Sequence, residues 1–388
     1  MRNSDNCYYS LTLEVCQENI EKHNGNLVIR NSNVNCLPRG LVVNSLSIIN
    51  SKITSLPDDI IINEDLIVIN TPLESLPKGI VIPRDILLRE TKISSLPDDL
   101  KVGGSIDISC NPITSLLKGL KVNGSLCIRN TNISELPGDL VVEKNLFASC
   151  TNITTLPSTV KIGADIFLSH SKLMSLPDNL VVHGSLNIFS TNITKLPKGL
   201  VVKGSLIAFH CPIESLPDDL VVMGDSINIA NTKVSKIPNM IKMKTINIRN
   251  TPITELSEGM VLNGDLYASN SKLESLPKDL VAEDIYIDGT HITSLPTTMK
   301  VKSISMTNTN ITSLPDNLIV NGNLNIGMTN INCLPSGLII KGDLYMYNTK
   351  ISELPADIIV KGDLCADNIS ALVIPDTAII KGRRISKY

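Results

Sequence analysis

The sequence contains no tryptophan and only four phenylalanines among 388 residues, which excludes an aromatic core. Hydrophobic residues still make up 42% of the chain, so we expect a core of aliphatic side chains. The formal net charge is −3. Because nucleic-acid-binding proteins normally carry a basic excess, we expect no nucleic-acid partner.

Long apolar runs are also missing. No stretch of about 18 apolar residues occurs, so we expect no membrane span. The first ten residues, MRNSDNCYYS, lack the apolar region of a secretory signal peptide. The nine cysteines are odd in number and include no C-x-x-C pair, which favours free thiols in a reducing compartment. They are Cys7, Cys16, Cys36, Cys110, Cys127, Cys150, Cys211, Cys333 and Cys365.

An internal repeat dominates the sequence. The dipeptide Leu-Pro, or a close variant, returns eighteen times between Leu37 and Pro375, with a period of 20 residues and occasionally 19 or 21. One repeat, residues 196–215, reads LPKGLVVKGSLIAFHCPIES. With Leu196 as position 0, apolar residues return at positions 4, 6, 10, 12 and 17. A period of this length predicts a solenoid whose core grows along the stack rather than several globular domains.

The spacing within a repeat predicts strands and bends. Positions 10 and 12 alternate as in a strand with one buried face, and positions 4 and 6 suggest a second short extended segment. The proline at position 1 fits a bend, because it removes a backbone donor. Glycine is frequent at position 8, where we expect a tight turn outside the sheet.

Two polar positions recur beside the predicted strand. Position 15 carries a small polar residue that we expect to satisfy backbone groups from inside the coil. Examples are Thr71, Thr91, Asn111, Thr131, Thr151, Ser171, Thr191, Thr251, Ser271, Thr309, Thr329 and Thr349. Position 9 is Ser, Thr, Asn or Asp, as in Asp65, Ser105 and Asp343. We interpret position 9 as a structural ladder at the strand entry.

This pattern resembles the leucine-rich repeat, L-x-x-L-x-L-x-x-N-x-L-x-x-L-P-x-x-L. The matching residues in one repeat are Leu186, Ile188, Thr191, Ile193, Leu196, Pro197 and Leu200. The 20-residue length and the LPxxL signature resemble the bacterial effectors of type III secretion systems of the YopM/IpaH type. Two features depart from the family: its first leucine is displaced by one residue, to Val182 and its equivalents, and threonine mostly replaces asparagine.

The resemblance covers residues 24–375 and implies a leucine-rich-repeat solenoid, mostly β, with about 18 repeats and parallel strands along one ribbed face. It also implies a non-enzymatic, protein-binding scaffold without cofactors. As an effector, the chain would be secreted without a signal peptide and engage a host protein in the host-cell cytoplasm. The alternatives are a bacterial cytoplasmic location and a structural or adhesive protein, bacterial or phage-borne, that self-associates or binds glycans. The sequence carries no signal for an oligomeric state.

Both ends have the composition of caps. Residues 12–22 place Leu13, Cys16, Gln17 and Ile20 on one face of a predicted short helix within an N-terminal cap, residues 1–23. The first 11 residues resemble the secretion signals of type III effectors, and the alternative is a frayed terminus. The polar and basic segment 376–388 is the expected C-terminal cap.

The side chains at positions 11 and 13 must face outward if positions 10 and 12 face the core. All four phenylalanines and four tyrosines fall there, beside three arginines. We predict that this face binds a protein partner, because exposed apolar patches usually mark interfaces and because aromatic and arginine side chains dominate binding energy. The predicted contact residues are Phe147, Phe167, Phe189, Phe209, Tyr267, Tyr286, Tyr345, Tyr347, Arg89, Arg129 and Arg249.

Neighbouring aromatic rings should nearly stack, because adjacent strands lie about 4.8 Å apart. The predicted pairs are Phe147 with Phe167, Phe189 with Phe209, and Tyr267 with Tyr286. The alternatives for the face are sheet packing, self-association and a carbohydrate-stacking platform.

No catalytic or metal-binding motif stands out. His170 and His210 share position 14 but lie two repeats apart, which is too far for one metal ion. Cys365 and Asp367 match the Cys-x-Asp of the related ubiquitin ligases, but they fall in the last repeat rather than in a separate helical domain, so we interpret them as strand residues. We therefore expect the repeat region alone, without the ligase domain.

Overall fold

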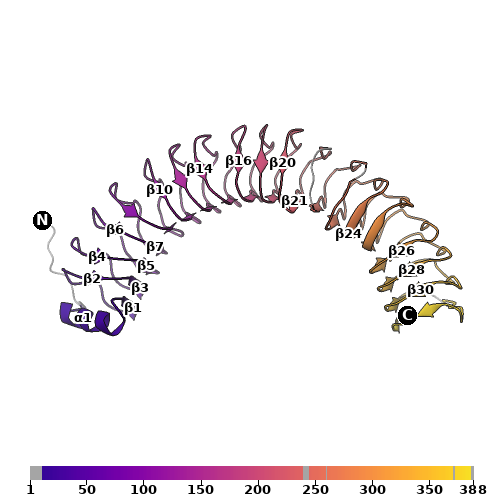
Figure 1. The fold of residues 1–388 in the computed structure, drawn as a ribbon, viewed down its shortest axis with the longest axis horizontal. Helices are drawn as coiled ribbons and strands as arrows, with labels where there is room; N and C mark the ends of the chain where they lie inside the picture. Colours follow the sequence, from indigo (N-terminus) through magenta and orange to yellow (C-terminus); the bar gives the residue numbers. More distant parts are fainter. Residues whose placement is uncertain (1–10, 239–243, 259, 370–371, 386–388) are drawn as a thin grey trace. The chain divides into compact units, whose positions relative to one another are not determined.

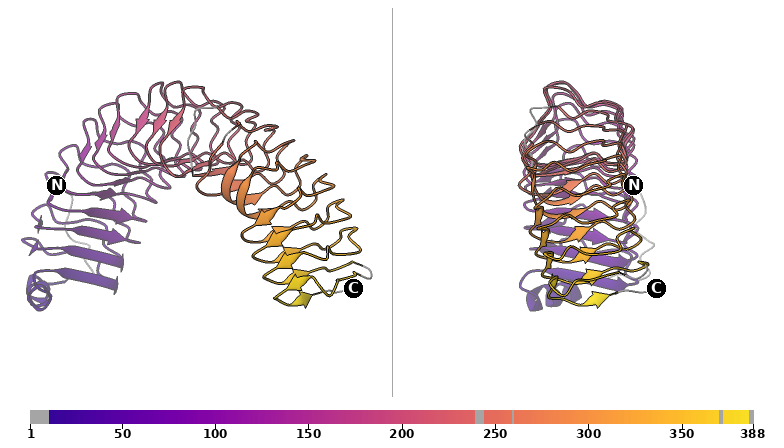
Figure 2. Two further views of the ribbon diagram at one scale, coloured as in Figure 1. Left: turned by 45° about the vertical axis from the view of Figure 1, so that its right-hand side comes forward. Right: turned by 90° about the vertical axis from the view of Figure 1, so that its right-hand side faces the viewer.

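The computed structural model describes residues 11–238, 244–258, 260–369 and 372–385. The chain forms two compact units, Met1–Asn192 and Ile193–Tyr388. In each unit, parallel strands pair from one repeat to the next, so that every repeat is one coil of a solenoid. The strands of each unit are stacked as parallel arrows in Figure 2.

The main sheet of the first unit contains nine strands in the part of the chain from residue 11 onward. Parallel pairs join them in chain order. They are β1 (Leu27–Ser32), β3 (Leu46–Ser51), β5 (Leu66–Ile69), β7 (Ile86–Arg89), β9 (Ile106–Asp107), β11 (Leu126–Cys127), β13 (Leu146–Phe147), β15 (Ile166–Phe167) and β17 (Leu186–Asn187).

Among the described residues, the main sheet of the second unit contains ten strands, also parallel and joined in chain order. They are β19 (Leu206–Ile207), β21 (Ser226–Asn228), β22 (Thr245–Asn247), β23 (Leu266–Tyr267), β24 (Val281–Tyr286), β25 (Lys300–Ser305), β27 (Leu324–Asn325), β29 (Leu344–Tyr345), β31 (Leu364–Cys365) and β33 (Arg384–Ile385).

The second extended segment predicted at positions 4 to 6 is present as two-residue strands. In the first unit these are β2 (Val42–Val43), β4 (Ile61–Ile62), β6 (Val81–Ile82), β8 (Lys101–Val102), β10 (Lys121–Val122), β12 (Val141–Val142), β14 (Lys161–Ile162) and β16 (Val181–Val182). In the second they are β18 (Val201–Val202), β20 (Val221–Val222), β26 (Ile319–Val320), β28 (Ile339–Ile340), β30 (Ile359–Val360) and β32 (Ile379–Ile380). In Figure 1, β3 and β5 of the first unit lie opposite β2 and β4.

The aliphatic core between these two layers confirms the predicted positions. In the coil that begins at Leu136, the side chains at positions 4, 6, 10, 12 and 17 have no exposed surface. They are Leu140, Val142, Leu146, Ala148 and Ile153. Burial of one aliphatic side chain contributes about 1.5–3 kcal/mol, which makes this column the main source of stability.

In two 19-residue repeats the two extended segments form one strand. Residues 276–294 and 295–313 each lack one residue at the turn near position 8. In these two coils the short and the main segments fuse into the six-residue strands β24 and β25. Residues 37–55 also lack one residue, but β2 and β3 stay separate there, so the shorter turn allows the two segments to fuse without requiring it.

Hydrogen bonds confirm the roles predicted for positions 15 and 9. In most of the described coils the hydroxyl at position 15 donates to a carbonyl three residues earlier in the same coil, as Thr131 Oγ1 does to Ile128 O at 2.7 Å. Thr91 Oγ1 instead donates to Asn111 Oδ1, and Ser271 Oγ is buried without a hydrogen-bond partner. The side chain at position 9 accepts from the backbone N–H of its counterpart in the next coil, as Asn145 Oδ1 does from Asp165 N at 3.0 Å. Both ladders satisfy backbone groups at the ends of the strands.

The glycines at position 8 have a different role from the one predicted. Gly104, Gly124 and Gly184 do not adopt positive φ angles. A Cβ at Gly184 would instead overlap the backbone and the carboxylate of Asp165 in the preceding coil. The close approach of successive coils therefore selects glycine at this position, not the shape of a tight turn.

The predicted capping helix is present as α1 (Leu13–Lys22), which lies at the start of the stack beside β1 (Figure 1). Thr12 is its N-cap, and its Oγ1 accepts from Val15 N at 3.3 Å. Cys16 is buried, whereas Gln17, which the sequence placed on the same face, is exposed. The first 11 residues, where the sequence suggests a secretion signal, fall almost entirely outside the described residues.

The last coil continues the backbone path past residue 375. Strand β32 pairs with β30, and β33 pairs with β31 in the same register. Position 10 of this coil is the exposed Arg384 instead of a buried aliphatic residue. Residues 376–385 of the segment predicted to be the C-terminal cap thus follow the strand path of the preceding coils, and their role as a cap stays a prediction.

Two further findings bear on the composition. Cys36 is disulfide-bonded, so the prediction of free thiols is wrong at this residue. An odd number of cysteines does not prevent a disulfide between two of them. The other described cysteines, Cys16, Cys110, Cys127, Cys150, Cys211, Cys333 and Cys365, are free thiols.

In the described part of the chain, no helix has the length and apolar character needed to cross a membrane.

Candidate partner-binding face

The eight predicted aromatic residues lie on the side of the strands opposite the core. In β13, for example, Leu146 is buried while Phe147 is half-buried on the outer face. All eight rings are half-buried rather than fully in water, because they lie against one another and against polar neighbours. The predicted orientation is therefore correct, and the rings form ordered clusters on the strand surface.

The first unit contains a three-member stack on this face. The rings of Phe147 and Phe167 are stacked, with centroids 5.0 Å apart and planes inclined by 15°. The guanidinium of Arg129, one coil earlier, lies 4.6 Å from the centroid of Phe147. Phe147 is thus enclosed between a cation and a second ring, and the predicted stacking of Phe147 on Phe167 is confirmed.

The second unit repeats this arrangement with tyrosines. Tyr267 and Tyr286 are stacked with centroids 5.0 Å apart and planes inclined by 4°, which confirms the second predicted pair. The guanidinium of Arg249 lies 4.7 Å from the centroid of Tyr267, and its Nε is buried without a hydrogen-bond partner. The Tyr267 hydroxyl donates to Asp265 Oδ2 at 2.9 Å. Each unit therefore has an arginine at position 13 followed by rings at position 11 of the next two coils.

Stacking leaves the edges of the inner rings, not their faces, toward solvent. Phe147 has Arg129 on the side of the preceding coil and Phe167 on the side of the following coil. Tyr267 is flanked in the same way by Arg249 and Tyr286. Such a fixed row of ring edges and guanidinium groups loses little conformational entropy when a partner binds.

Two further phenylalanines lie beside histidines at the end of the strand. The Phe189 ring contacts His170 in an edge-on arrangement, with centroids 4.5 Å apart, within the first unit. In the second unit Phe209 contacts His210 with centroids 5.4 Å apart. The predicted stacking of Phe189 on Phe209 stays a prediction. The histidines at position 14 therefore extend the aromatic surface of each unit.

Tyr345 and Tyr347 form the last aromatic cluster, in the coil that begins at Leu334. The Tyr345 hydroxyl donates to Asp343 Oδ2 at 3.0 Å. The Tyr347 ring covers Gly327 of the preceding coil so closely that a Cβ there would overlap the ring. A glycine at an outward position thus makes the space in which Tyr347 lies flat on the sheet.

Arg89 belongs to an ion pair, not to an aromatic stack. Its Nε donates to Asp107 Oδ2 at 2.8 Å. Asp107 also accepts from Ser109 N at 3.0 Å and Ser109 Oγ at 2.6 Å. Burial raises the pKa of Asp107, but the hydrogen bonds from Arg89 and Ser109 outweigh it and hold this pKa below its usual value. Among the three predicted arginines, Arg89 therefore offers a partner the least available charge.

We expect acid to weaken this contact between coils. A carboxylate with a depressed folded-state pKa adds stability above its unfolded-state pKa, and that stability is lost as the pH falls through the folded-state value. Below about pH 4, the unfolding midpoint of the wild-type chain should therefore drop more steeply than that of Asp107→Asn. Thermal unfolding across pH measures the difference, and parallel pH profiles for the two proteins would contradict the role of Asp107.

The asparagines beside the strands are a feature that the sequence analysis missed. Position 14 has a positive φ angle throughout the described coils, as at Asn50, Asn70 and Asn130. Several of the asparagine side chains form an amide ladder, in which Asn70 Nδ2 donates to Asn50 Oδ1 at 2.8 Å. Asparagine tolerates this left-handed conformation better than most residues, so its frequency at one position was the available signal.

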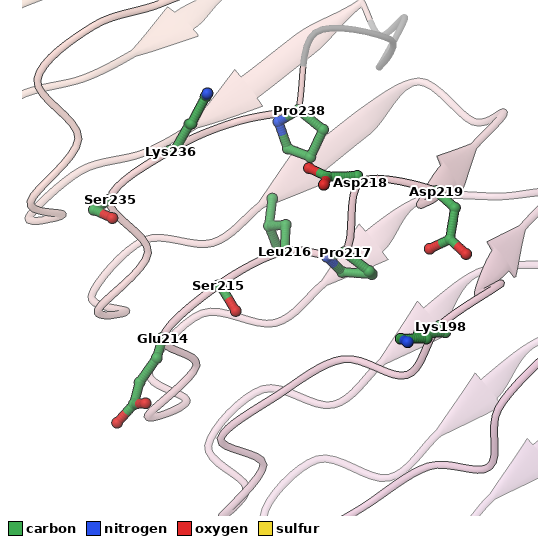
Figure 3. A pocket seen from close by; sticks show the side chains of 10 residues that line it. All are labelled: Lys198, Glu214, Ser215, Leu216, Pro217, Asp218, Asp219, Ser235, Lys236 and Pro238. Carbon is green, nitrogen blue, oxygen red and sulfur yellow. The ribbon is translucent and has the colours of Figure 1, made fainter.

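A hollow of 690 Å³ opens on the turns of the second unit (Figure 3). Its side chains are Lys198, Glu214, Ser215, Leu216, Pro217, Asp218, Asp219, Ser235, Lys236 and Pro238. Asp219 Oδ2 accepts from Gly199 N at 2.9 Å and so ties one turn to the next. Similar hollows lie between the turns of other coils, such as residues 58–83 and 98–123. They follow from the spacing of the coils and do not form a convergent site.

Two thiols on the outward strand positions, Cys127 and Cys365, lack the lowered pKa of a nucleophile. Burial raises the pKa of the Cys127 and Cys365 thiols, whereas a nucleophilic cysteine needs a lowered pKa. Cys365 lies in strand β31, as its interpretation as a strand residue requires. Within the described ranges, no three His, Cys, Asp or Glu side chains are arranged to hold a metal ion.

No protein-family profile matches this sequence. No curated protein matches it either. The fold is similar to YopM from Yersinia enterocolitica WA-314, which is 17% identical over 95% of this chain and 93% of its own, with a TM-score of 0.57. It is also similar to YopM from Yersinia pestis, a leucine-rich effector protein, at 16% identity over 96% and 91% of the two chains and a TM-score of 0.50. The chain thus has the leucine-rich-repeat fold, a parallel-strand solenoid of about 18 turns.

Proposed function

We propose that this chain is a non-enzymatic scaffold that binds a protein partner through the outward face of its main strands. The observation that carries the proposal is the repeated arginine–aromatic stack, Arg129 with Phe147 and Phe167 in one unit and Arg249 with Tyr267 and Tyr286 in the other. Aromatic and arginine side chains contribute most of the binding energy in protein interfaces.

The arrangement favours a protein over a glycan. A sugar stacks on the open face of a ring, whereas both faces of Phe147 and Tyr267 are already covered by neighbours. Ring edges beside guanidinium groups instead suit the backbone carbonyls and side chains of a polypeptide.

We further propose that the chain is a secreted bacterial effector whose partner is a host protein in the host-cell cytoplasm. The fold likeness to YopM of Yersinia pestis, an effector protein, supports this role. The repeat length and the LPxxL signature, typical of the YopM/IpaH type, support it from the sequence. The test therefore uses a host-cell lysate as the source of partners.

Replacing Phe147, Phe167, Phe189 and Phe209 together with serine is expected to abolish partner capture. The rings are half-buried, so each loss removes contact area from the face but leaves the aliphatic core intact. The immobilised chain and its variant are incubated with lysate, and the bound proteins are quantified by mass spectrometry. We expect the specifically captured protein to drop by at least about tenfold, which corresponds to one strong contact residue.

A matched control changes apolar residues on the opposite side of the coils. Val42, Ile61, Val81 and Val181 are exposed there and lie in the short strands. Their replacement by serine should leave capture unchanged, and circular dichroism should show both variants folded. Capture that survives the phenylalanine changes, or is lost with the control changes, would place the interface elsewhere.

A further inference from the structure

Charge is distributed unevenly along the outward positions 9, 11 and 13 of the second unit. Between Arg249 and Asp367 these positions hold one arginine and six aspartates. The aspartates are Asp265, Asp284, Asp288, Asp343, Asp363 and Asp367. In the first unit, the same positions between Arg30 and Phe167 hold three arginines and four aspartates. The tyrosine-bearing face of the second unit is thus distinctly acidic.

Most contacts of these carboxylates are with neutral donors, which hold their geometry but do not cancel their charge. Asp265 accepts from the Tyr267 hydroxyl and from Asp284 N. Asp288 accepts from Ser305 Oγ, Thr307 N, Thr307 Oγ1 and Ser269 Oγ. Asp363 is the exception, because Arg383 of the last coil forms an ion pair with it at 2.7 Å. A concentration of fixed negative charge therefore remains beside the tyrosine rings.

Asp284 differs from its neighbours in a way that also points to a cationic ligand. Its Oδ1 is buried and has no hydrogen-bond partner. It lies in β24 two residues before Tyr286, whose ring is the outer member of the stack with Tyr267. A charged oxygen without a donor is costly, and a cation nearby lowers that cost. Arg249, whose guanidinium lies 5.8 Å from the centroid of Tyr286, supplies one positive charge beside this cluster, against the two carboxylates of Asp265 and Asp284.

The acidic groups and tyrosines form two clusters at a defined spacing. The first contains Asp265, Asp284 and Tyr286, and the second contains Asp343, Tyr345 and Tyr347. Three coils separate β24 from β29 along the ladder. At about 4.8 Å per strand the separation is roughly 14 Å, which an extended chain spans in about four residues.

We infer that this face of the second unit binds a basic, extended segment of the partner protein, with two arginine or lysine side chains four residues apart. Each cation would lie beside the carboxylates of one cluster and over or against its tyrosine rings. In the second cluster the Tyr345 hydroxyl donates to Asp343, and a phenol that donates to a carboxylate is more electron-rich, which favours a cation over its ring. This inference rests on the proposed protein-binding function and adds the chemistry of the partner and the part of the face that binds it.

The test measures binding of a fluorescein-labelled peptide, GSRGSGRSG, to the full chain by fluorescence anisotropy. The comparison peptides are GSEGSGESG, with reversed charge, and GSRRGSGSG, with adjacent arginines. At low ionic strength we expect the first peptide to bind at least about tenfold more tightly than the acidic one, and more tightly than the one with adjacent arginines. No preference for the first peptide over the acidic one would overturn the inference, and equal binding of the two arginine peptides would overturn the spacing.

The protein variant that removes the charge is Asp265→Asn, Asp284→Asn and Asp343→Asn together. Asparagine already occupies position 9 at Asn145 and Asn323, where its Oδ1 accepts from the next coil, so the fold should be kept. We expect this variant to bind the peptide about tenfold more weakly than the wild-type chain. The matched control, Asp65→Asn with Asp85→Asn, changes the same ladder in the first unit and should leave peptide binding unchanged.

Equal loss of peptide binding in both variants would mean general charge attraction and would overturn the inference, as would no loss in either. Failure here is distinguishable from failure of the proposed function. If the phenylalanine variant loses its captured protein while the Asp265→Asn, Asp284→Asn, Asp343→Asn variant still captures it, the face binds a protein that is not recognised through basic residues.

Discussion

Replacing Asn111 with leucine is expected to lower the free energy of unfolding by about 4 kcal/mol. Asn111 is 3% exposed and uses its whole amide in the core. Its Oδ1 accepts from Thr91 N and Thr91 Oγ1, both at 2.8 Å, and its Nδ2 donates to Leu88 O at 2.7 Å and Ile108 O at 2.9 Å. Leucine fills a similar volume but leaves at least three buried backbone groups unpaired, at about 1–3 kcal/mol each.

A second variant, Asn111→Thr, distinguishes the contribution of the hydrogen bonds within one coil from that of the hydrogen bonds between coils. Asn111→Thr should keep the bond to Ile108 O, as Thr131 does with Ile128 O, but lose the bonds to Thr91 and Leu88 in the preceding coil. We expect Asn111→Thr to lower the free energy of unfolding by about half as much as Asn111→Leu does. Chemical denaturation followed by circular dichroism measures both. The exposed Asn132→Leu serves as the control and should change stability by less than about 0.5 kcal/mol.

A shift of under about 1 kcal/mol for Asn111→Leu would mean that water or a rearranged coil satisfies these groups. That outcome would contradict the idea that the amide joins two coils. The comparison also bears on the fold, because threonine replaces asparagine at this position in most other repeats. The hydroxyls of Thr131 and Thr151 donate to carbonyls of their own coils, whereas the Asn111 amide also bonds Thr91 and Leu88 of the preceding coil and so joins two coils.

The core and the direction of each side chain were predictable from the sequence because a repeat multiplies a weak signal. Alternation at positions 10 and 12 alone, as at Leu146 and Ala148, fits many short strands. The same alternation at the same place in every repeat leaves one arrangement, in which Phe147 must face outward. The ring pairs Phe147–Phe167 and Tyr267–Tyr286 then follow from the strand spacing.

What the sequence did not reveal depends on contacts between specific coils. The position of Arg129 over Phe147 requires that a residue at position 13 reach position 11 of the next coil, which periodicity within one repeat does not indicate. The pairing of Arg89 with Asp107 has the same geometry with a carboxylate in place of the ring. In both cases the arginine at position 13 contacts the residue at position 11 of the next coil, which is a ring in one case and a carboxylate in the other.

The left-handed bends and the glycines were missed for a different reason. Frequent asparagine at position 14 and glycine at position 8 both suggest turns, but only the structure shows which of the two positions needs a positive φ angle. Asparagine occupies the left-handed position, whereas glycine occupies a position limited by the next coil. The sequence analysis explained glycine at position 8 by its backbone freedom, but the structure shows that this position needs a residue without a side chain.

Replacing Gly362 with valine should destabilise the second unit by about 3 kcal/mol. Gly322, Gly342, Gly362 and Gly382 form a column in which each N–H donates to the carbonyl one coil earlier, as Gly362 N does to Gly342 O at 2.9 Å. A Cβ at Gly362 would overlap that carbonyl and the carboxylate of Asp343. The coil must move to make room, which also stretches the bond from Asp363 N to Asp343 Oδ1.

The size of the added side chain distinguishes this collision from a loss of backbone freedom. If the Cβ itself collides, Gly362→Ala should already show most of the loss, whereas alanine at a glycine with negative φ and open space would be neutral or stabilising by about 0.4–1 kcal/mol. Lys144→Val is the control, because position 8 of that coil tolerates a side chain and Lys144 is exposed. A stable Gly362→Ala variant, measured by chemical denaturation, would show that successive coils can separate here at little cost, and the glycine column would then need another explanation.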